Sequence, residues 1–449
     1  MNAELVSEEE LVTPTTRIYA YLALAFSLLV AGAFDQNEVM TAISVLLIFS
    51  TIVIRSYVYL MTSVIRSLEV EIEKPEIVRE GSTFKVKYYV RNPSYIPLIF
   101  LEIITAKPPY LPQVSGGNGA LAILPPKSML EITEEYTARI GKHTFGELRA
   151  VVRDPLGLFK SSEIPIGFSF EIKGVPLIEE RGIARQIAFT RTIGTTRTRR
   201  AGPSGTEFHS VRYYNPGDEL RRVVWRVLAS RNELVVKEFE IESNLYILLV
   251  FLPSYEMFWG KPLNTALEHC LRLIASIAFY SSRRGDNIGL IIWSRKPIIS
   301  KKFHRGVNAF QSINKMIARV DFDPSLMSTR SIDILIKRHI LPILKERTIV
   351  LFFLTPSEYL VNSLEKSFHM LHSNKHIVYA VLFPPTEYEV KSLREPLASL
   401  YKLKVLPSYE SVLDLVKRLR RIGIKTVIVD PETPLTTIID ILDTHRIAL

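Results

Sequence analysis

Two long apolar runs near the start of the chain constrain its fold more than any other feature. Residues 18–34 carry no side chain that ionises at neutral pH, and residues 39–54 form a second apolar run. At ~1.5 Å per residue, a helix of either length approaches the ~30 Å apolar core of a bilayer. The link at residues 35–38 is short. We therefore predict an N-terminal tail at residues 1–16 and a transmembrane helical hairpin at residues 17–65.

The flanking charges predict how this hairpin is oriented. A signal peptide is the alternative for the first run, but the segment before it is acidic and a second apolar run follows at once. Apolar character resumes after Arg55, so the second helix can be longer and tilted, with Arg55 reaching the headgroups. Basic residues follow the hairpin, at Arg55, Arg66, Lys74 and Arg79, and none lies in the link. We therefore expect a cell-membrane protein with two spans and cytoplasmic soluble domains.

The residues after the hairpin predict two folded domains. Residues 68–178 contain short alternating strands, at 68–73, 83–90, 98–106, 129–138 and 146–153, broken by Pro, Gly and Asn, as in an immunoglobulin-like β-sandwich. Residues 108–119 are expected to be an exposed loop. In residues 244–449, apolar strands at 245–252, 287–293, 348–354, 377–383 and 426–430 alternate with amphipathic helices at 263–282, 307–319, 332–345 and 411–422. This alternation predicts an α/β domain with a parallel sheet.

Composition limits the chemistry and the partners. The formal net charge of +10 favours an anionic partner, and the basic linker at residues 179–204 could contact anionic lipid or an acidic protein. The single cysteine, Cys270, excludes an intrachain disulfide. No phosphate-binding glycine motif follows a strand, and no nucleophile elbow is present. We therefore expect no catalytic residues and no cofactor.

Residues 205–243 form the most informative block. Residues 215–218 predict a turn, with Asp218 as the N-cap of a following helix whose apolar positions include Leu220, Val223 and Val227. The turn, the cap and packing of the Trp225 ring suffice to explain Pro216, Gly217, Asp218 and Trp225 as fold-forming residues. The arginines of the block exceed what stability needs.

This block resembles the signature of the family called domain of unknown function fifty-eight. The matching positions are Gly205, Glu207, Phe208, Arg212, Tyr214, Pro216, Gly217, Asp218, Arg221, Trp225, Ser230, Arg231, Leu234, Val236, Lys237, Glu238 and Glu240. Residues 153–159 are similar to a second family segment, D-P-x-G-L-F. The resemblance implies that residues 244–449 form a von Willebrand factor A-like domain and that a MoxR-type AAA+ ATPase is the partner.

Domains of that type often hold a divalent cation at the sheet edge, and this chain departs from the required pattern. Leu252 replaces the expected aspartate, and only Ser254 remains, with Glu256 in the place of the second serine. Thr355-Pro356 stands where Ser-Asp is usual. Hard cations need carboxylate oxygens, so we expect no metal here. The cluster His369, His372 and His376 is likewise expected to be a solvated helix end.

Three functions remain open from the sequence. The first is a membrane-anchored, non-enzymatic scaffold that recognises proteins, with a docking face made by Arg212, Arg221, Arg222 and Arg231 and with Asp218 orienting one of them. The second is a hydrolase of envelope polymers or nucleic acid, for which Glu207, Asp218 and Glu238 are the carboxylates to test. The third is a cation-dependent adhesion module outside the cell.

Overall fold

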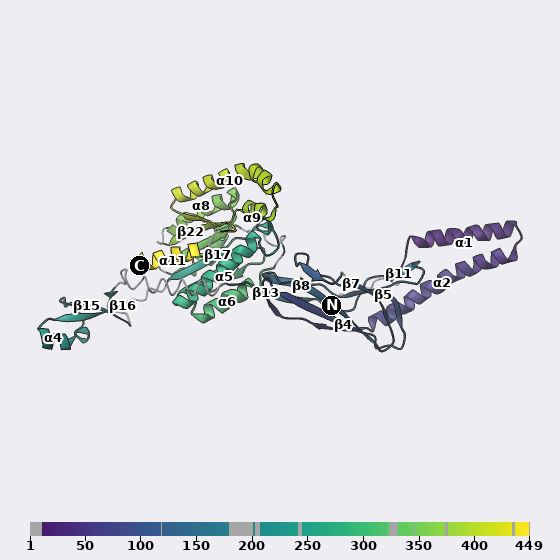
Figure 1. The fold of residues 1–449 in the computed structure, drawn as a ribbon, viewed down its shortest axis with the longest axis horizontal. Helices are drawn as coiled ribbons and strands as arrows, with labels where there is room; N and C mark the ends of the chain where they lie inside the picture. The colour runs from purple at the N-terminus through teal and green to yellow at the C-terminus, as the bar shows by residue number, and fades with distance from the viewer. Residues whose placement is uncertain are drawn as a thin grey trace. The chain divides into compact units, whose positions relative to one another are not determined.

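The computed structural model describes residues 11–117, 119–178, 201–202, 207–240, 245–321, 323, 331–345, 347–372, 376–432 and 436–448. The chain divides into two compact units, Met1–Gly174 and Val175–Leu449 (Figure 1). The first unit contains both the hairpin and the sandwich, which the sequence predicts as separate domains. The predicted basic linker lies outside the described residues except for Ala201 and Gly202.

The two apolar runs form a helical hairpin, as predicted. Helix α1 covers Arg17–Phe34 and helix α2 covers Glu38–Arg66, and the two lie side by side (Figure 1). Asn37 caps α2, because its side-chain oxygen accepts hydrogen bonds from the backbone N–H groups of Val39 and Met40. Both helices are long and apolar enough to cross a membrane, which supports membrane association.

The C-terminal part of α2 belongs to the core of the sandwich. At ~1.5 Å per residue, its 29 residues span about 43 Å, which exceeds the apolar core of a bilayer. Val58, Met61, Val64 and Ile65 are buried in one cluster with sandwich residues. These positions lie on one face of a helix. The predicted extension of the second helix past Arg55 is therefore present, and it ends against the sandwich.

The sandwich is built from short antiparallel strands. Its two four-stranded sheets have the orders β2-β4-β8-β6 and β12-β10-β5-β7, and a three-stranded sheet has the order β3-β13-β9. The five predicted strands correspond to β2, β4, β5, β8 and β10. The expectation that residues 108–119 are only a loop is wrong, because β6 lies within them and pairs with β8. The strands of this unit are β1 (Val12–Pro14), β2 (Glu69–Glu73), β3 (Ile77–Arg79), β4 (Thr83–Arg91), β5 (Leu98–Ile104), β6 (Gln113–Ser115), β7 (Gly119–Leu124), β8 (Met129–Thr137), β9 (Gly141–Phe145), β10 (Arg149–Val152), β11 (Phe159–Ser161), β12 (Ile164–Pro165) and β13 (Phe170–Val175).

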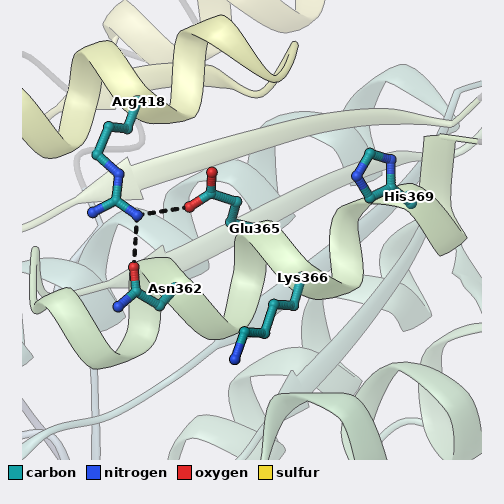
Figure 2. A pocket seen from close by; sticks show the side chains of 5 residues that line it. All are labelled: Asn362, Glu365, Lys366, His369 and Arg418. Atoms are coloured by element: carbon teal, nitrogen blue, oxygen red, sulfur yellow. Dashed lines mark hydrogen bonds and ion pairs between the residues drawn. The ribbon is translucent and has the colours of Figure 1, made fainter.

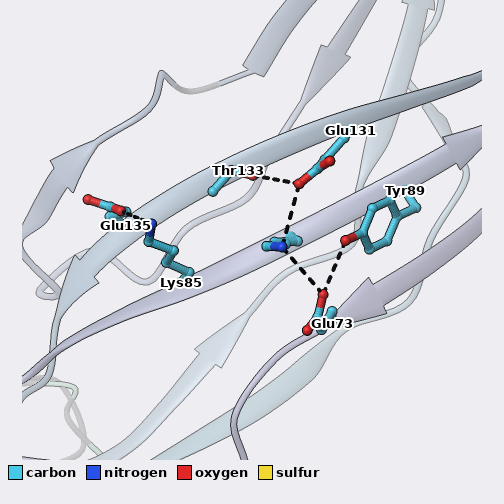
Figure 3. Close-up of polar contacts among 7 residues, drawn as sticks. Glu73, Lys85, Tyr89, Glu131, Thr133 and Glu135 are labelled. Carbon is cyan, nitrogen blue, oxygen red and sulfur yellow. Dashed lines mark hydrogen bonds and ion pairs between the residues drawn. The ribbon is translucent and has the colours of Figure 1, made fainter.

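Strand β4 shows why this sheet has one register. One face of the strand supplies the buried side chains Phe84, Val86, Tyr88 and Val90. The other face takes part in a cross-strand ladder of opposite charges (Figure 3). Lys87 Nζ lies 3.8 Å from Glu73 and 3.7 Å from Glu131, and Lys85 Nζ lies 2.8 Å from Glu135. A slip of one residue would bury these lysines and expose the apolar face.

The D-P-x-G-L-F segment fixes the start of α1 to the sandwich. Asp154 is buried, and its carboxylate accepts hydrogen bonds from the backbone N–H groups of Leu156 over 2.8 Å and Phe159 over 2.6 Å. Gly157 has a φ of 67°, which favours glycine. Its carbonyl accepts a hydrogen bond from the hydroxyl of Thr15 over 2.6 Å, and β1 pairs with β11 next to it. Both ends of the hairpin are therefore attached to the sandwich.

The second unit contains a sheet with five consecutive parallel strands. Its order is β19-β18-β17-β21-β22-β23, and β20 also pairs with β18. The parallel strands lie where the sequence predicts them. Helix α5, with α6 and α11 against it, covers one face, and α7, α8 and α10 pack on the other (Figure 1). The strands are β17 (Tyr246–Phe251), β18 (Asn287–Ile292), β19 (Ile298–Ile299), β20 (His304–Arg305), β21 (Ile349–Leu354), β22 (Ile377–Leu382) and β23 (Lys425–Ile428).

The helices of this unit differ in part from the prediction. The first two predicted helices are α5 (Ala266–Arg284) and α6 (Val307–Ile317). The third is shorter, because α7 (Ile332–Leu335) continues into a π-helical turn at Ile336–Ile340. The fourth is the last part of a longer helix, α10 (Leu397–Arg421). The expected helix end at His369 and His372 is the end of α8 (Glu358–His372), for which the sequence analysis predicts no bounds. The sequence did not predict α9 (Pro385–Ser392) or α11 (Thr436–Ala448).

Candidate functional site

Residues 207–240, here called the signature module, form a small unit around a hairpin. Strand β15 (Glu207–Tyr213) pairs antiparallel with β16 (Val235–Glu240), and β14 (Ala201–Gly202) pairs with the other edge of β16. A 3-10 turn, η2 (Leu220–Arg222), and a short helix, α4 (Trp225–Arg231), lie between the two strands. Asn232 ends α4 in the left-handed conformation that often closes helices. The module therefore carries the block that the sequence singles out.

The turn at residues 215–218 forms as predicted. The backbone N–H of Asp218 donates to the carbonyl of Asn215 over 3.1 Å. Gly217 has a φ of 111°, which is a conformation that favours glycine at the third position of such a turn. Pro216 at the second position has the φ that this turn needs. These two signature residues are explained by the backbone alone.

Asp218 does not cap a helix, contrary to the prediction. Its carboxylate receives two hydrogen bonds from the Arg212 guanidinium, over 2.7 and 2.8 Å, and a third from the backbone N–H of Asn215 over 2.9 Å. The bonds from Arg212, and then the one from Asn215, lower the pKa of Asp218 to about 2. Asp218 therefore stays ionised and holds Arg212 across the turn, which is the orienting contact that the sequence suggests.

The predicted continuous helix after Asp218 is also wrong. Val223 forms a β-bridge with Val236, and the backbone N–H of Val224 donates to the carbonyl of Val235 over 2.9 Å. Val223, Val235 and Val236 are buried. Two adjacent β-branched residues fit this extended pairing well. The helix therefore begins only at Trp225.

Trp225 is largely exposed, so the prediction that its ring packs in the fold is wrong. Its side chain is 57% exposed, and three further large side chains of the module are at least half exposed, namely Val211 (50%), Leu220 (62%) and Tyr213 (69%). Tryptophan and tyrosine side chains are enriched at protein interfaces, so exposed ones on this module are candidates for a contact surface.

The arginines of the module divide into two groups. Arg212 is held by Asp218, and Arg222 forms an ion pair with Glu219 over 3.1 Å. Arg221, Arg226 and Arg231 are exposed. Within the described part of the chain, these three make no ion pair. Of the predicted docking face, Arg212 and Arg222 are therefore held in ion pairs, and Arg221 and Arg231 are exposed. Arg226, which was not among the predicted docking residues, is exposed as well.

The remaining signature residues are placed by the backbone or lie outside the description. Gly205 lies outside the described residues. Glu207 pairs in register with Glu240, and Glu238 pairs with Ser210 after a bulge that follows Phe208. Tyr214 lies next to the turn, and its backbone N–H donates to the carbonyl of Leu234. Lys237 lies on β16, where it is exposed and pairs with Val211.

The edge of the parallel sheet supplies hydroxyl groups where a cation would need carboxylates. The Thr355 hydroxyl donates to the Ser254 hydroxyl over 3.1 Å, and Thr355 is fully buried. Leu252 is buried and bonds through its backbone to Phe353. Glu256 lies in the 3-10 turn η3 (Tyr255–Phe258), one turn further along the chain. Two neutral hydroxyls that bond to each other are a poor donor set for a hard cation. That no metal binds stays a prediction.

The three histidines of the second candidate metal cluster have separate surroundings. His369 lines an open cavity on α8 with Asn362, Glu365, Lys366 and Arg418 (Figure 2). In this cavity, Arg418 of α10 donates to Glu365 over 2.8 Å and to Asn362 over 2.7 Å, so it joins the two helices. His372 stacks on Phe368, and His376 Nδ1 accepts a hydrogen bond from the backbone N–H of Thr348.

Comparison with known proteins finds a family model that matches part of the chain. Residues 210–392 match the family described as "Protein of unknown function DUF58". No curated protein matches the chain. Among solved structures, BatB from Bacteroides thetaiotaomicron is 13% identical, with a TM-score of 0.28, over 46% of this chain and 99% of that one. An aerotolerance-related membrane protein from Bacteroides fragilis is 10% identical, with a TM-score of 0.26, over 46% of this chain and 100% of that one. The CARDB domain of a Pyrococcus furiosus protein is 16% identical, with a TM-score of 0.17, over 24% of this chain and 87% of that one.

Proposed function

Because residues 210–392 belong to the DUF58 family, we propose that this protein is a membrane-anchored, non-enzymatic scaffold that docks a partner protein on its signature module. The observation that carries the proposal is the 57% exposed ring of Trp225 in a short stretch that also exposes Arg221 and Arg231. Tryptophan and arginine are enriched among the residues that dominate binding energy at protein interfaces. A surface with both needs a partner that has an apolar pocket and acidic side chains.

The family resemblance supplies the partner. The resemblance implies a MoxR-type AAA+ ATPase, and such an ATPase is the partner we propose, acting in the assembly or maturation of complexes at the membrane. The parallel sheet of the second unit, covered by helices on both faces, supports a von Willebrand factor A-like domain. In our proposal this domain recognises protein without a metal ion.

The two other functions have less support. A hydrolase would need a carboxylate that exchanges protons near neutral pH, but Asp218 is held by Arg212 and has a pKa of about 2. A cation-dependent adhesion module would need aspartates at the positions of Leu252 and Pro356. The nearest carboxylate along the chain is that of Glu256, which lies in η3.

The test is a binding measurement with purified components. Full-length protein in mild detergent is immobilised and exposed to the MoxR-type ATPase of the same cell. We expect Trp225→Ala, and separately Arg221→Ala with Arg231→Ala, to weaken binding at least about tenfold, as expected at an interface hot spot. Arg319→Ala is the matched control, since Arg319 is an exposed arginine at the end of α6.

The outcome separates a docking face from ordinary surface charge. Equal weakening by the Arg319 variant and the module variants would show that only net charge matters. Absence of binding by the wild-type protein would remove the ATPase from the proposal.

A further inference from the structure

A cavity outside the signature module opens at the carboxyl end of the parallel sheet. It has a volume of about 330 Å³ and is here called the α5/α9 pocket. Its walls come from the segment before α5, the first half of α5, helix α9 and the residue after Asp430. The residues that line it are Lys261, Asn264, His269, Arg272, Tyr388, Lys391, Ser392 and Pro431. In open α/β sheets, ligands bind in crevices beyond the carboxyl ends of the strands, and this volume lies in the lower range of ligand pockets.

Three cationic side chains converge on this pocket from separate elements. Lys261 precedes α5, Arg272 lies on α5, and Lys391 lies on α9. Lys261 is exposed, and no ion pair involves it within the described part of the chain. Lys391 is paired over 3.4 Å with Glu432, but both side chains are more than half exposed, at 55% and 82%, so an incoming anion can compete for the lysine.

The floor of the pocket is polar and fixed. His269 Nδ1 and the Tyr388 hydroxyl are 2.7 Å apart, and Tyr388 is only 2% exposed. Burial lowers the pKa of His269 to about 4 and raises that of Tyr388, so both are neutral at pH 7. The ring and the hydroxyl therefore share one proton along this hydrogen bond, and which nitrogen of His269 carries the N–H depends on the tautomer. Arg272 Nη2 donates to the carbonyl of Leu263 over 2.6 Å, which ties α5 to the preceding segment.

The wall opposite the helices is also tightly built. Gly260 has a φ of 112°, and a Cβ atom there would lie 3.4 Å from Tyr388 and 3.1 Å from the carbonyl of Asn264. The positive φ and the short approach to the Asn264 carbonyl both favour glycine at this position. The loop that carries Lys261 and Asn264 is therefore held in one position over the pocket.

The charges around the pocket favour an anion. The three cations face two carboxylates, Glu432 and Asp430, and Asp430 is close enough to act on both His269 and Tyr388. The remaining lining groups are neutral, and the side-chain amide of Asn264 can donate hydrogen bonds. A carboxylate or phosphate group accepts several such bonds at once and is the chemistry that this donor set fits.

We propose that the α5/α9 pocket binds a small molecule through a phosphate or carboxylate group, held by Lys261, Arg272 and Lys391. The proposal is independent of the docking role of the signature module, because none of the lining residues belongs to that module.

The test uses the full-length protein in detergent, at low ionic strength, with two probes: inorganic phosphate and citrate. Binding is measured by titration calorimetry. We expect saturable binding of at least one probe, and the identity of that probe distinguishes a phosphate site from a carboxylate site. The double variant Lys261→Gln with Lys391→Gln should weaken this binding at least about tenfold, because it removes two of the three charges.

The matched control is Lys315→Gln with Lys337→Gln, which removes the same charge from exposed positions outside the pocket. It should leave the affinity unchanged within about twofold. Equal weakening in both double variants, or no saturable binding of either probe to the wild-type protein, would overturn the proposal.

Discussion

The carboxylate of Asp154 accepts a hydrogen bond from the backbone N–H of Phe159 over 2.6 Å, inside the turn that holds the N-terminal strand against the sandwich. We expect Asp154→Ala to destabilise the protein by about 1–3 kcal/mol, because it leaves the buried N–H group of Phe159 and the part-buried one of Leu156 without an acceptor. Thermal unfolding of the full chain in detergent, followed by fluorescence, measures the effect. Glu163→Ala is the control: it breaks an exposed ion pair with Arg149 and should cost less than about 1 kcal/mol.

The orientation of the hairpin can be tested with added cysteines. Cys270 is fully buried, so it should not react in the folded protein. We expect Ser82→Cys, in an exposed turn of the sandwich, to be protected from an impermeant thiol reagent on intact cells and labelled after permeabilisation. Gln36→Cys, in the exposed link between α1 and α2, is the matched control and should be labelled on intact cells. The reverse pattern would place the sandwich outside the cytoplasm.

The contact between Arg212 and Asp218 predicts a specific response to acid. The pKa of Asp218 is lowered from its ordinary value of 3.8 to about 2 in the folded module. The carboxylate therefore contributes stability above about pH 4 and loses it as the pH falls towards 2. Fluorescence of Trp225, in a variant that lacks Trp259 and Trp293, should stay constant from pH 7 to 5. Asp218→Asn should change that signal already at pH 7, and an unchanged signal would contradict the role given to this pair.

His269 predicts a second pH response, in the window from 6.5 to 4. Burial is the main cause that lowers its pKa to about 4, and the nearby Arg272 charge adds to it. Between these pH values the unfolded chain binds a proton that the folded chain does not, so stability falls as the pH falls. The shift corresponds to roughly 3 kcal/mol between pH 7 and 4. His269→Gln should flatten the dependence of the melting temperature on pH. His369→Gln, at an exposed histidine, should leave it unchanged.

The turn and the parallel strands could be predicted because each depends on residues close in sequence. Gly217 needs only its own positive φ, and the strand at 349–354 is an unbroken apolar run. The helix after Asp218 failed for a different reason. The spacing of Val223 and Val227 fits a helix, but the bridge between Val223 and Val236 favours extended backbone, and that partner lies beyond α4. A long-range pairing of this kind leaves no local signal.

The pockets and the exposed surfaces were hidden from the sequence for a related reason. The α5/α9 pocket brings together residues from Lys261 to Pro431, and none of its four segments has a motif. Trp225 shows the opposite difficulty, since an aromatic residue in a signature suggests burial and only the structure shows its exposure. In α2, apolar residues occupy most positions on all sides of the helix, so periodicity could not separate the face of Val58 and Ile65 from the rest.

The burial of Val58, Met61, Val64 and Ile65 in the sandwich has a mechanical consequence. Removal of residues 1–67 would take these four side chains out of the core of the sandwich. A fragment that lacks the hairpin would therefore contain a cavity. The same helix that is long and apolar enough to cross a membrane is also a wall of the sandwich. A force applied to the sandwich would therefore be transmitted along a continuous helix and not through a flexible linker.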